Sequence, residues 1–357
     1  MAQRVVLHIG PRKTATTYLQ RVLQSLVRSG DIPAGMYPIR TRGRVDHNHV
    51  PGLIDLVRSA GEIGLQDDAW TQQDGSDAAS LLRAVADAPG DVILSAEAMS
   101  VLRPSGVRAV VDALAPAPVD VVITARALDR VLPSSWQQHM RNGNFEAYDA
   151  YLALRDEERQ SRIYETELAR AFWRAYRYPD LVRRWQDVAR SVSLVTVPTG
   201  SADPAETWRR FRAAAGIDAL PVEPPAIPDD RANVSLTGAE TYAIYGLNLV
   251  ARAAGHGRRE IRAWHRALIR DGWTDRADRG PRLGLPAGIR SSVHAWSTED
   301  LADLRTCSVA VHGDLDDLEC AADAADPGVP SPDAVAAAAG AALTRLLDSD
   351  SAASNED

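Results

Sequence analysis

The chain has 357 residues, of which 45% are apolar, and its formal net charge is −8. This length and apolar content are sufficient for one large domain or two smaller ones with a full hydrophobic core. The negative charge argues against general nucleic-acid binding, which needs a basic field over an extended surface, so an anionic ligand requires a local basic pocket.

The sequence predicts a soluble, cytoplasmic protein without a membrane span. No apolar run approaches the length of a span, and the first residues enter a strand-like segment without a signal-peptide pattern. Cys307 and Cys320 are the only cysteines, and they lack the number and spacing of a disulfide framework or a zinc site. We therefore expect a reducing compartment and no metal.

The first predicted element leads to Lys13, the single lysine among 40 basic residues. Residues 4–9 form a short apolar run, typical of a strand buried on both faces, and Gly10 and Pro11 end it. Residues 14–17 then offer three threonine hydroxyls at the start of an amphipathic helix. A helix start with free N–H groups, hydroxyls and a compact lysine charge is an anion site, most often for phosphate.

The spacing of this loop differs from that of the nucleoside-triphosphate P-loop. That motif requires glycine, four residues and then Gly-Lys-Ser/Thr, whereas Gly10 lies three residues before Lys13 and Arg12 precedes the lysine. No predicted strand ends at an aspartate that would hold magnesium. A P-loop-like kinase is therefore a less favoured alternative.

Strands and helices alternate along the rest of the first half. Further strands are predicted over residues 91–95, 119–124 and 192–197. Helices are predicted over residues 78–86, 107–114, 161–176, 180–189, 238–254, 259–270 and 297–305. This order predicts an α/β fold, with a parallel sheet flanked by helices and a largely helical C-terminal half.

The composition changes after residue 320. Residues 321–357 are rich in alanine, aspartate and serine, so we expect one helix over residues 333–347 and disorder over residues 348–357. Residues 1–320 are predicted to form the functional domain, and no catalytic residue is expected beyond it.

Residues 11–17, Pro-Arg-Lys-Thr-Ala-Thr-Thr, resemble the 5′-phosphosulfate loop of the sulfotransferases that use 3′-phosphoadenosine 5′-phosphosulfate (PAPS). The family pattern is a strand, Pro-x-Lys-Thr/Ser-Gly-Thr-Thr and a helix, and Ala15 is the one departure. Glycine is needed at that position if φ is positive or if phosphate presses against the Cα atom. Alanine therefore predicts a helical φ or a looser grip at Ala15.

A second pattern resembles the 3′-phosphate site of the same family. Arg126 follows the strand predicted over residues 119–124, and Ser134 lies eight residues further on, as in family members. Residues 121–142, 194–198 and 311–315 look like the actinobacterial branch of the family. The resemblance covers roughly residues 4–320 and implies a P-loop-like sulfotransferase fold.

The resemblance implies roles for the residues of these patterns. Lys13 would act at the bridging oxygen of the donor, and Arg126 and Ser134 would bind its 3′-phosphate. The 5′-phosphate would be bound by the remaining loop residues Arg12, Thr14, Ala15, Thr16 and Thr17. A late loop containing Arg276, Arg279 and Arg282 would close over the 3′-phosphate, or would be a solvated basic loop.

Two candidates remain for the general base. Glu97 follows the strand predicted over residues 91–95, at the position where relatives present a catalytic His or Glu. The rival is the pair His47 and His49, since histidine titrates near neutrality. His8 is predicted to pack beneath the loop as a strand histidine.

Six residues are candidates for binding the acceptor: His47, His49, Trp136, His139, Tyr148 and Tyr151. The sequence thus predicts an enzyme that moves a sulfuryl group from PAPS to a hydroxyl of a small molecule, lipid or sugar by in-line displacement, and releases 3′-phosphoadenosine 5′-phosphate (PAP). The alternative from another class is a catalytically silent nucleotide-binding protein of the same fold.

Overall fold

The structure is a computed structural model that describes residues 2–39, 49–58, 76–167, 170–199, 203, 205–227, 236–273, 280–321 and 328–353. The chain divides into two compact units. The first unit comprises Met1–Leu128, Arg155–Ile227 and Ala295–Cys320, and the second comprises Asp129–Leu154, Pro228–His294 and Ala321–Asp357. One of these boundaries falls after Cys320, where the composition changes, while the single domain over residues 1–320 stays a prediction.

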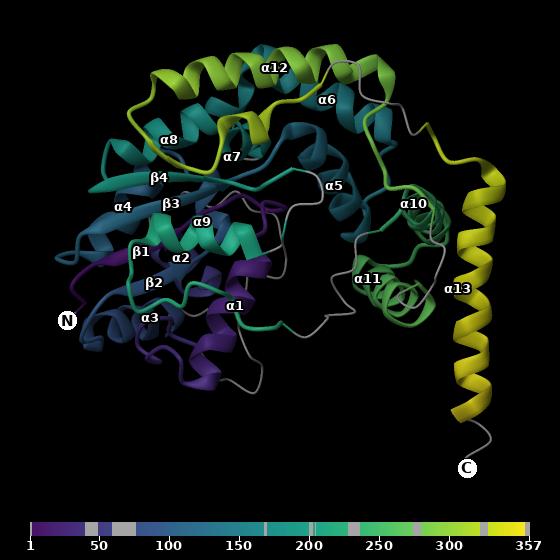
Figure 1. The fold of residues 1–357 in the computed structure, drawn as a ribbon. Helices are drawn as coiled ribbons and strands as arrows, with labels where there is room; N and C mark the ends of the chain where they lie inside the picture. Colours follow the sequence, from purple (N-terminus) through teal and green to yellow (C-terminus); the bar gives the residue numbers. More distant parts are fainter. Residues whose placement is uncertain are drawn as a thin grey trace. The chain divides into compact units, whose positions relative to one another are not determined.

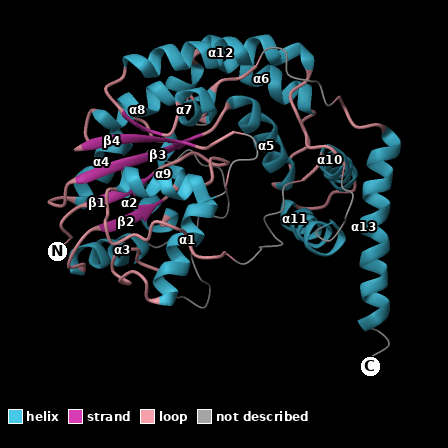
Figure 2. Ribbon diagram, viewed as in Figure 1, coloured by secondary structure: helices cyan, strands magenta, loops and turns pink. Residues whose placement is uncertain are grey.

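The first unit contains a five-stranded parallel sheet flanked by helices, as Figures 1 and 2 show. Its order is β2-β1-β3-β4-β5, with bounds β1 Val5–His8, β2 Val92–Ser95, β3 Val119–Ala125, β4 Ser191–Thr196 and β5 Ala310–His312. The α/β class and the four predicted strands are confirmed. The fifth strand has only three residues, too few for an alternating pattern to reveal it.

Among its described residues, the first unit has ten helical segments around this sheet, not counting the helices that it shares with the second unit. They are α1 Thr16–Ser29, α2 Val50–Arg58, α3 Ser76–Asp87, η2 Glu97–Val101, α4 Pro104–Leu114, η3 Ile163–Glu165, α7 Phe172–Tyr176, α8 Tyr178–Gln186, α9 Ala205–Ala215 and η6 Leu315–Leu318. Because β1 pairs with β2 on one side and β3 on the other, the strand order reverses at β1. Ligands of such sheets bind beside the carboxyl ends of the strands at this reversal.

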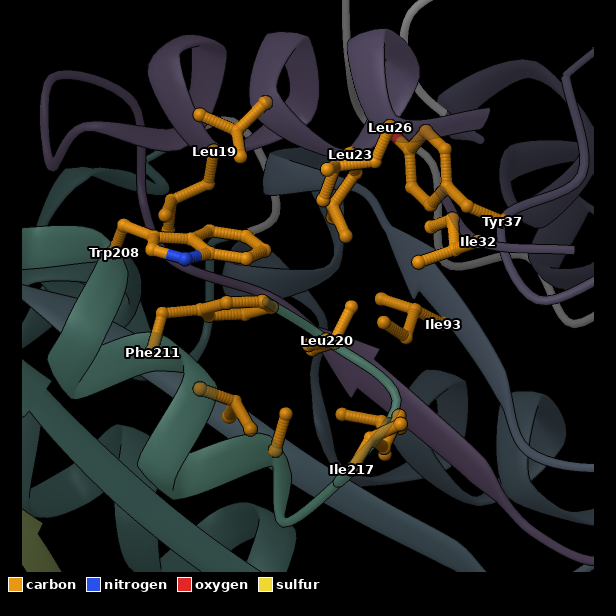
Figure 3. Packing of buried hydrophobic residues seen from close by; sticks show 14 of the residues in the cluster. Leu19, Leu23, Leu26, Ile32, Tyr37, Ile93, Trp208, Phe211, Ile217 and Leu220 are labelled. Atoms are coloured by element: carbon orange, nitrogen blue, oxygen red, sulfur yellow. The ribbon is translucent and has the colours of Figure 1, made fainter. Parts of the chain in front are cut away.

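One face of the sheet is covered by α1 and α9. Figure 3 shows the cluster that joins them, in which Leu19, Leu23 and Leu26 of α1 meet Trp208 and Phe211 of α9, all buried. Burying each such side chain contributes roughly 1.5–3 kcal/mol. This packing holds the first turn of α1 at the carboxyl end of β1.

The segment between residues 161 and 176 departs from the predicted helix. It contains the short 3₁₀ helix η3 and the five-residue helix α7. The buried guanidinium of Arg174 donates to the carbonyls of Tyr164 and Glu167 within this segment, and to Val101 at 2.9 Å. A continuous helix would use those carbonyls internally, so the buried arginine favours the broken conformation.

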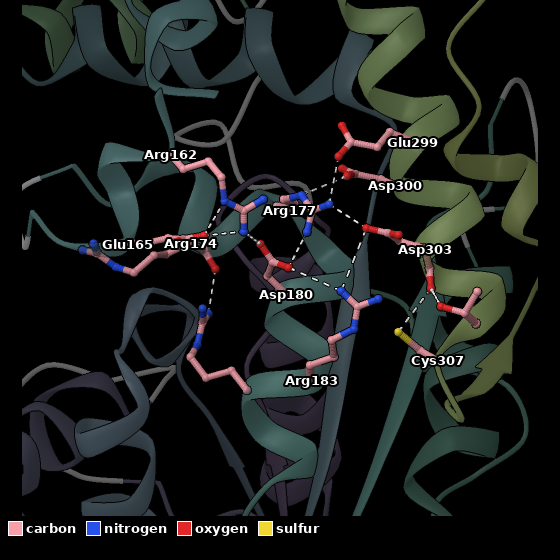
Figure 4. Close-up of polar contacts among 12 residues, drawn as sticks. Arg162, Glu165, Arg174, Arg177, Asp180, Arg183, Glu299, Asp300, Asp303 and Cys307 are labelled. Carbon is pink, nitrogen blue, oxygen red and sulfur yellow. Dashed lines mark hydrogen bonds and ion pairs between the residues drawn. The ribbon is translucent and has the colours of Figure 1, made fainter. Parts of the chain in front are cut away.

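An ion-pair network joins α6 (Tyr148–Ser161) and the start of α8 to the second half of α12 (Ala287–Thr306), and Figure 4 shows the part around Arg177. Arg159 donates to Asp300 at 2.6 Å and to Glu299 at 2.8 Å. Arg177 donates to Glu299 at 3.0 Å and to Asp303 at 2.6 Å. These carboxylates raise the pKa of both arginines above its usual value, against the opposing effect of burial.

The second unit is helical. Its helices, some of which extend into the first unit along the chain, are α5 Leu128–Arg141, α6 Tyr148–Ser161, α10 Gly238–Ala253, α11 Arg258–Ala267, η5 Leu268–Trp273, α12 and α13 Pro332–Ala353. The last of these runs beyond the predicted residues 333–347. Among the described helices, none has the length and apolar character needed to cross a membrane.

Candidate anion-binding site

Three segments of the first unit meet the rim formed by the carboxyl ends of the strands. The loop that contains Lys13 follows β1, Glu97 follows β2 and Arg126 follows β3. In register, His8 of β1 lies opposite Ser95 of β2, and β1 also pairs with β3. The three segments therefore leave adjacent strands at the point where the strand order reverses.

The backbone of the loop is unusual at two positions. Lys13 has φ 71° and Ala15 has φ 65°, in the left-handed region that favours glycine. The expectation of a helical φ at Ala15 is therefore wrong: this alanine takes the conformation for which the family uses glycine. Left-handed residues that alternate with right-handed ones turn successive N–H groups toward one side and form an anion-binding concavity.

Side chains bind three successive carbonyl oxygens of the loop. Thr14 Oγ1 donates to the carbonyl of Pro11 at 2.6 Å, and the Tyr176 hydroxyl donates to that of Arg12 at 2.6 Å. The Arg126 guanidinium donates to the carbonyl of Lys13 at 3.2 Å. Because each peptide unit is planar, fixing these carbonyls also fixes the direction of the N–H groups that follow them.

The first turn of α1 has donors for an anion. Ala15 is the N-cap residue and supplies no side-chain acceptor. In the part of the chain that the structure describes, no acceptor lies within hydrogen-bond distance of the N–H groups or hydroxyls of Thr16 and Thr17. The first N–H groups of a helix have no partner within the helix, and its dipole adds positive potential there, so an anion satisfies both.

Arg126 is held at the end of β3 by one phenol. The Tyr178 hydroxyl accepts from the Arg126 N–H at 3.0 Å and donates to its carbonyl at 2.9 Å. Burial raises the pKa of Tyr178, so the phenol keeps the proton that it donates. The guanidinium lies beside the Lys13 carbonyl, which brings Lys13 and Arg126 together as predicted from their strand ends.

Glu97 is the first residue of η2 and is half-buried. Its Oε2 accepts a long hydrogen bond of 3.4 Å from Gln20 Nε2 on α1, the helix that begins at the loop. The side chain therefore lies beside the helix that carries Thr16 and Thr17. A carboxylate at this place can accept a proton.

His49 is buried, and its ring binds neighbouring backbone groups. Its Nδ1 accepts from the Ser95 N–H at 2.9 Å, and its Nε2 donates to the Pro38 carbonyl at 2.8 Å. Burial lowers its pKa to about 4, although both hydrogen bonds oppose this shift. Both nitrogens thus hold the end of β2, which argues against His49 as the base, and His47 lies outside the described residues.

His8 packs beneath the loop, as predicted. It is fully buried between Ser95 and Thr124, and its ring lies edge-on to Phe211 with centroids 5.3 Å apart. Burial lowers its pKa to about 3, so the ring is neutral near pH 7.

The aromatic candidates for acceptor binding belong to the second unit. Trp136 is fully buried, donates to the Glu146 carbonyl at 3.0 Å and stacks on Tyr148 with centroids 4.7 Å apart. Tyr148 is also buried and donates to the Gly284 carbonyl at 3.2 Å. Trp136 is therefore part of the core of this unit, and its role toward an acceptor stays a prediction.

His139 and Tyr151 lie close together in the same unit, with ring centroids 5.4 Å apart. The His139 Nε2 lies 2.6 Å from a Glu146 carboxylate oxygen, and its Nδ1 lies 3.1 Å from the Asn144 amide nitrogen. Tyr151 is buried. These two candidates thus take part in local contacts of the second unit.

The predicted 3′-phosphate residues other than Arg126 are not in the first unit or are not described. Ser134 is half-buried on α5, and Arg282 is exposed and forms a bridge with Thr237. Both belong to the second unit, and Arg276 and Arg279 lie outside the described residues. Their roles toward a nucleotide stay predictions.

Sequence reasoning missed the residues that support the loop. Tyr176 is the last residue of the helix predicted over residues 161–176, and Tyr178 lies between that helix and the next one. No spacing marks their hydroxyls as partners of the loop. Gln20 did carry a signal, because it is a polar residue on the apolar face of α1, one turn after Thr16. No group of three His, Cys, Asp or Glu residues suited to a metal occurs among the residues described.

The fold and this site define an α/β protein with a loop suited to an anion at the rim of a parallel sheet. No protein-family model and no curated protein matches the chain. Among solved structures, the chain is similar to a crystal structure titled as a sulfotransferase from Alicyclobacillus acidocaldarius, with 16% identity and a TM-score of 0.43, over 73% of this chain and 100% of that one. A likeness this distant identifies neither the family nor the activity of this chain.

Proposed function

We propose that the chain is a PAPS-dependent sulfotransferase. The observation that carries the proposal is the loop from Pro11 to Thr17, which combines the sequence pattern of a phosphosulfate loop with two left-handed residues and three bound carbonyls. Its open N–H groups and hydroxyls suit a 5′-phosphate, and a glycine-like φ at Ala15 removes the main departure from the family pattern.

In this function the donor is a substrate held by the loop. Thr16 and Thr17 would bind its 5′-phosphate, whereas the buried Thr14 would support the loop through its bond to the Pro11 carbonyl. The Lys13 ammonium would stabilise charge on the oxygen between phosphorus and sulfur. The bond from sulfur to that oxygen breaks as a bond from sulfur to the acceptor hydroxyl oxygen forms. Such transfer is accelerated mainly by positioning and by fixed positive charge.

Arg126 is proposed to bind the 3′-phosphate, with Ser134 as its second partner. A guanidinium suits this role because it presents several donors to the oxygens of one phosphate. The bonds from Tyr178 to both backbone groups of Arg126 fix its Cα position at the rim.

Glu97 is proposed as the general base, in preference to His49. The acceptor hydroxyl loses its proton to the carboxylate as the new bond to sulfur forms. The acceptor is a small molecule, lipid or sugar with a hydroxyl group.

Nucleotide binding tests the donor site. Calorimetry with PAP and with ADP, which lacks the 3′-phosphate, should show tighter binding of PAP. Arg126→Met should remove most of this preference, about tenfold or more in affinity. Arg190→Met is the matched control, because Arg190 pairs with Asp120 at the opposite end of the strands and should leave the preference intact.

Turnover separates an enzyme from a silent binding protein. Conversion of labelled PAPS to PAP with a mixture of hydroxyl acceptors should fall about 10²–10³-fold in Lys13→Ala, the loss expected when one charge-stabilising donor is removed. Lys13→Arg keeps the charge and tests the need for a narrow side chain. Wild type that binds PAP without turning over PAPS would favour the silent protein, and turnover of ATP that depends on magnesium would favour a kinase.

A further inference from the structure

A line of hydrogen bonds crosses the first unit beneath the loop, and its first half begins beside Glu97. Gln20 Nε2 lies 3.0 Å from Ser95 Oγ and 3.4 Å from Glu97 Oε2. Ser95 Oγ lies 2.9 Å from His8 Nδ1. An amide nitrogen only donates, so Ser95 accepts from Gln20 and keeps its own proton, which it donates to His8 Nδ1 when that nitrogen is unprotonated.

The second half of the line ends in the loop. His8 Nε2 lies 3.2 Å from Thr124 Oγ1, which lies 2.8 Å from Thr14 Oγ1, and Thr14 donates to the Pro11 carbonyl at 2.6 Å. A carbonyl only accepts, so the Thr14 hydroxyl donates its proton to Pro11 and accepts from Thr124. Thr124 therefore accepts from His8, which places the imidazole proton on Nε2.

The Thr14 end of the line assigns the tautomer, and the Ser95 end is compatible with it, because Ser95 has a proton for the free Nδ1. Every side chain along it is buried, with exposed fractions of 0% for His8, Thr14, Ser95 and Thr124 and 1% for Gln20. A methyl group on Gly10 would lie 1.7 Å from Thr124 Oγ1 and 3.0 Å from His8 Nε2, so the line passes directly under the loop. Buried polar groups of this kind specify one arrangement when all of them are satisfied.

We propose that His8, as the neutral imidazole with its proton on Nε2, is a positioning residue that connects Gln20 beside Glu97 to the carbonyl of Pro11 in the anion loop. One arm fixes the loop through Thr124 and Thr14. The other arm fixes Ser95 and the Gln20 amide that donates to Glu97. The assignment of Glu97 and the loop to sulfuryl transfer rests on the proposed function, whereas the hydrogen-bond line and its tautomer do not.

Two substitutions of His8 each keep one arm of hydrogen bonds and break the other. In His8→Gln the side-chain amide reaches the Nε2 position and retains a donor for Thr124, but nothing accepts from Ser95. In His8→Asn the amide oxygen takes the Nδ1 position and accepts from Ser95, but nothing donates to Thr124. We expect His8→Asn to raise amide hydrogen exchange of residues 10–17 about tenfold and to weaken PAP binding by a similar factor, the size of one lost hydrogen bond.

His8→Gln should leave loop exchange and PAP affinity within about threefold of wild type, and should lower kcat about tenfold through Glu97. Thr124→Val and Ser95→Ala cut the same arms outside the histidine and should reproduce His8→Asn and His8→Gln, respectively. Thr124→Val should add little to His8→Asn, and Ser95→Ala should add little to His8→Gln, because in each pair the same arm is already broken. Equal effects of all four variants on exchange, affinity and kcat would overturn the positioning role.

The tautomer is tested without nucleotide or turnover. In spectra of the full chain with ¹⁵N-labelled histidine, the signals lost in His8→Gln should be those of a neutral ring protonated on Nε2, unchanged between about pH 8 and pH 5. A proton on Nδ1, or titration near pH 6.5, would overturn the inference. If wild type binds no PAP, the proposed function fails, and the loop exchange and these spectra still decide whether His8 positions the loop.

Discussion

Two buried polar clusters of the first unit are constructed in opposite ways. The cluster under the loop is a line of neutral groups, in which each donor meets one acceptor from Gln20 to the Pro11 carbonyl. The cluster that joins α6 and the start of α8 to α12 is a network of full charges, in which Arg159 and Arg177 share Glu299 and Asp300. Arginines of the network are neutralised within the fold, whereas the contact shown for the Arg126 guanidinium is with a neutral carbonyl.

This difference explains how an arginine-rich chain with negative net charge can offer a basic pocket. Arginine bound to carboxylates stabilises the fold and adds little field at the rim. The part of the line directly beneath the loop, from His8 to Thr14, is neutral, and the Glu97 carboxylate lies only at its far end. The loop backbone is therefore fixed by groups that do not cancel the positive potential from α1 and Lys13.

Removing one charge from the network should have the largest effect on stability. Arg159→Met keeps much of the aliphatic side chain but removes the guanidinium, which lies over Trp173, and so leaves Asp300 and Glu299 with fewer partners. We expect a loss of about 3–5 kcal/mol in the free energy of unfolding, because the buried carboxylate is left poorly compensated. Urea denaturation measures this loss.

Arg209→Met is the control for that experiment, since Arg209 pairs with Asp203 and Glu223 at the surface and its loss should cost far less. Equal losses in the two variants would contradict the distinction between the buried network and a surface pair.

A methyl group placed in the neutral line should have the next largest effect. Gly10→Ala puts a Cβ atom against Thr124 Oγ1 and His8, which must shift. We expect a loss of about 1–3 kcal/mol, as for other overpacked sites, together with weaker anion binding. Gly90→Ala, where the added methyl meets nothing within 4 Å, is the control. Unchanged stability of Gly10→Ala would mean that the line is loosely packed.

Acid should lower the free energy of unfolding through the two buried neutral histidines. The folded pKa values of His8 and His49 are about 3 and about 4, below the ordinary 6.5. Between these values the two histidines bind protons in the unfolded chain but not in the folded chain. Their contribution is fully present above about pH 6.5 and is lost as pH falls toward these folded values, at about 1.4 kcal/mol per pH unit for each histidine. Urea denaturation between pH 7 and pH 5 should show this slope, and His8→Gln should reduce it by the share of one histidine. A slope unchanged in that variant would mean that His8 titrates normally.

Relief of backbone strain should give the smallest effect, and in the opposite direction. Ala15→Gly removes the Cβ atom from a left-handed residue and should stabilise the fold by about 1 kcal/mol, measured as a raised Tm. Ala214→Gly, on α9, should destabilise by a similar amount because glycine is unfavourable inside a helix. Destabilisation by Ala15→Gly would show that the alanine methyl makes a needed contact.

Local patterns in the sequence were enough to predict the sheet and the position of the loop. Buried parallel strands are continuous apolar runs, so four strands could be found, and their ends placed Lys13 and Arg126 together. The φ of Ala15 could not be predicted, because it depends on carbonyls bound by Tyr176 and Arg126, which are distant in sequence. The burial of His49 could not be predicted for the same reason: a loop histidine is indistinguishable from a buried one until Ser95 and Pro38 surround it.

The single lysine gives the loop a second use as a reporter of local opening. A lysine-specific protease has one peptide bond to cut in the whole chain, the bond between Lys13 and Thr14, and its carbonyl is the one bound by Arg126. Proteases cut backbone that opens, so the rate of this one cleavage measures how often the loop leaves its bound conformation. Each digestion divides the chain into a 13-residue peptide and the remainder, and a single band on a gel would follow the motion of the site.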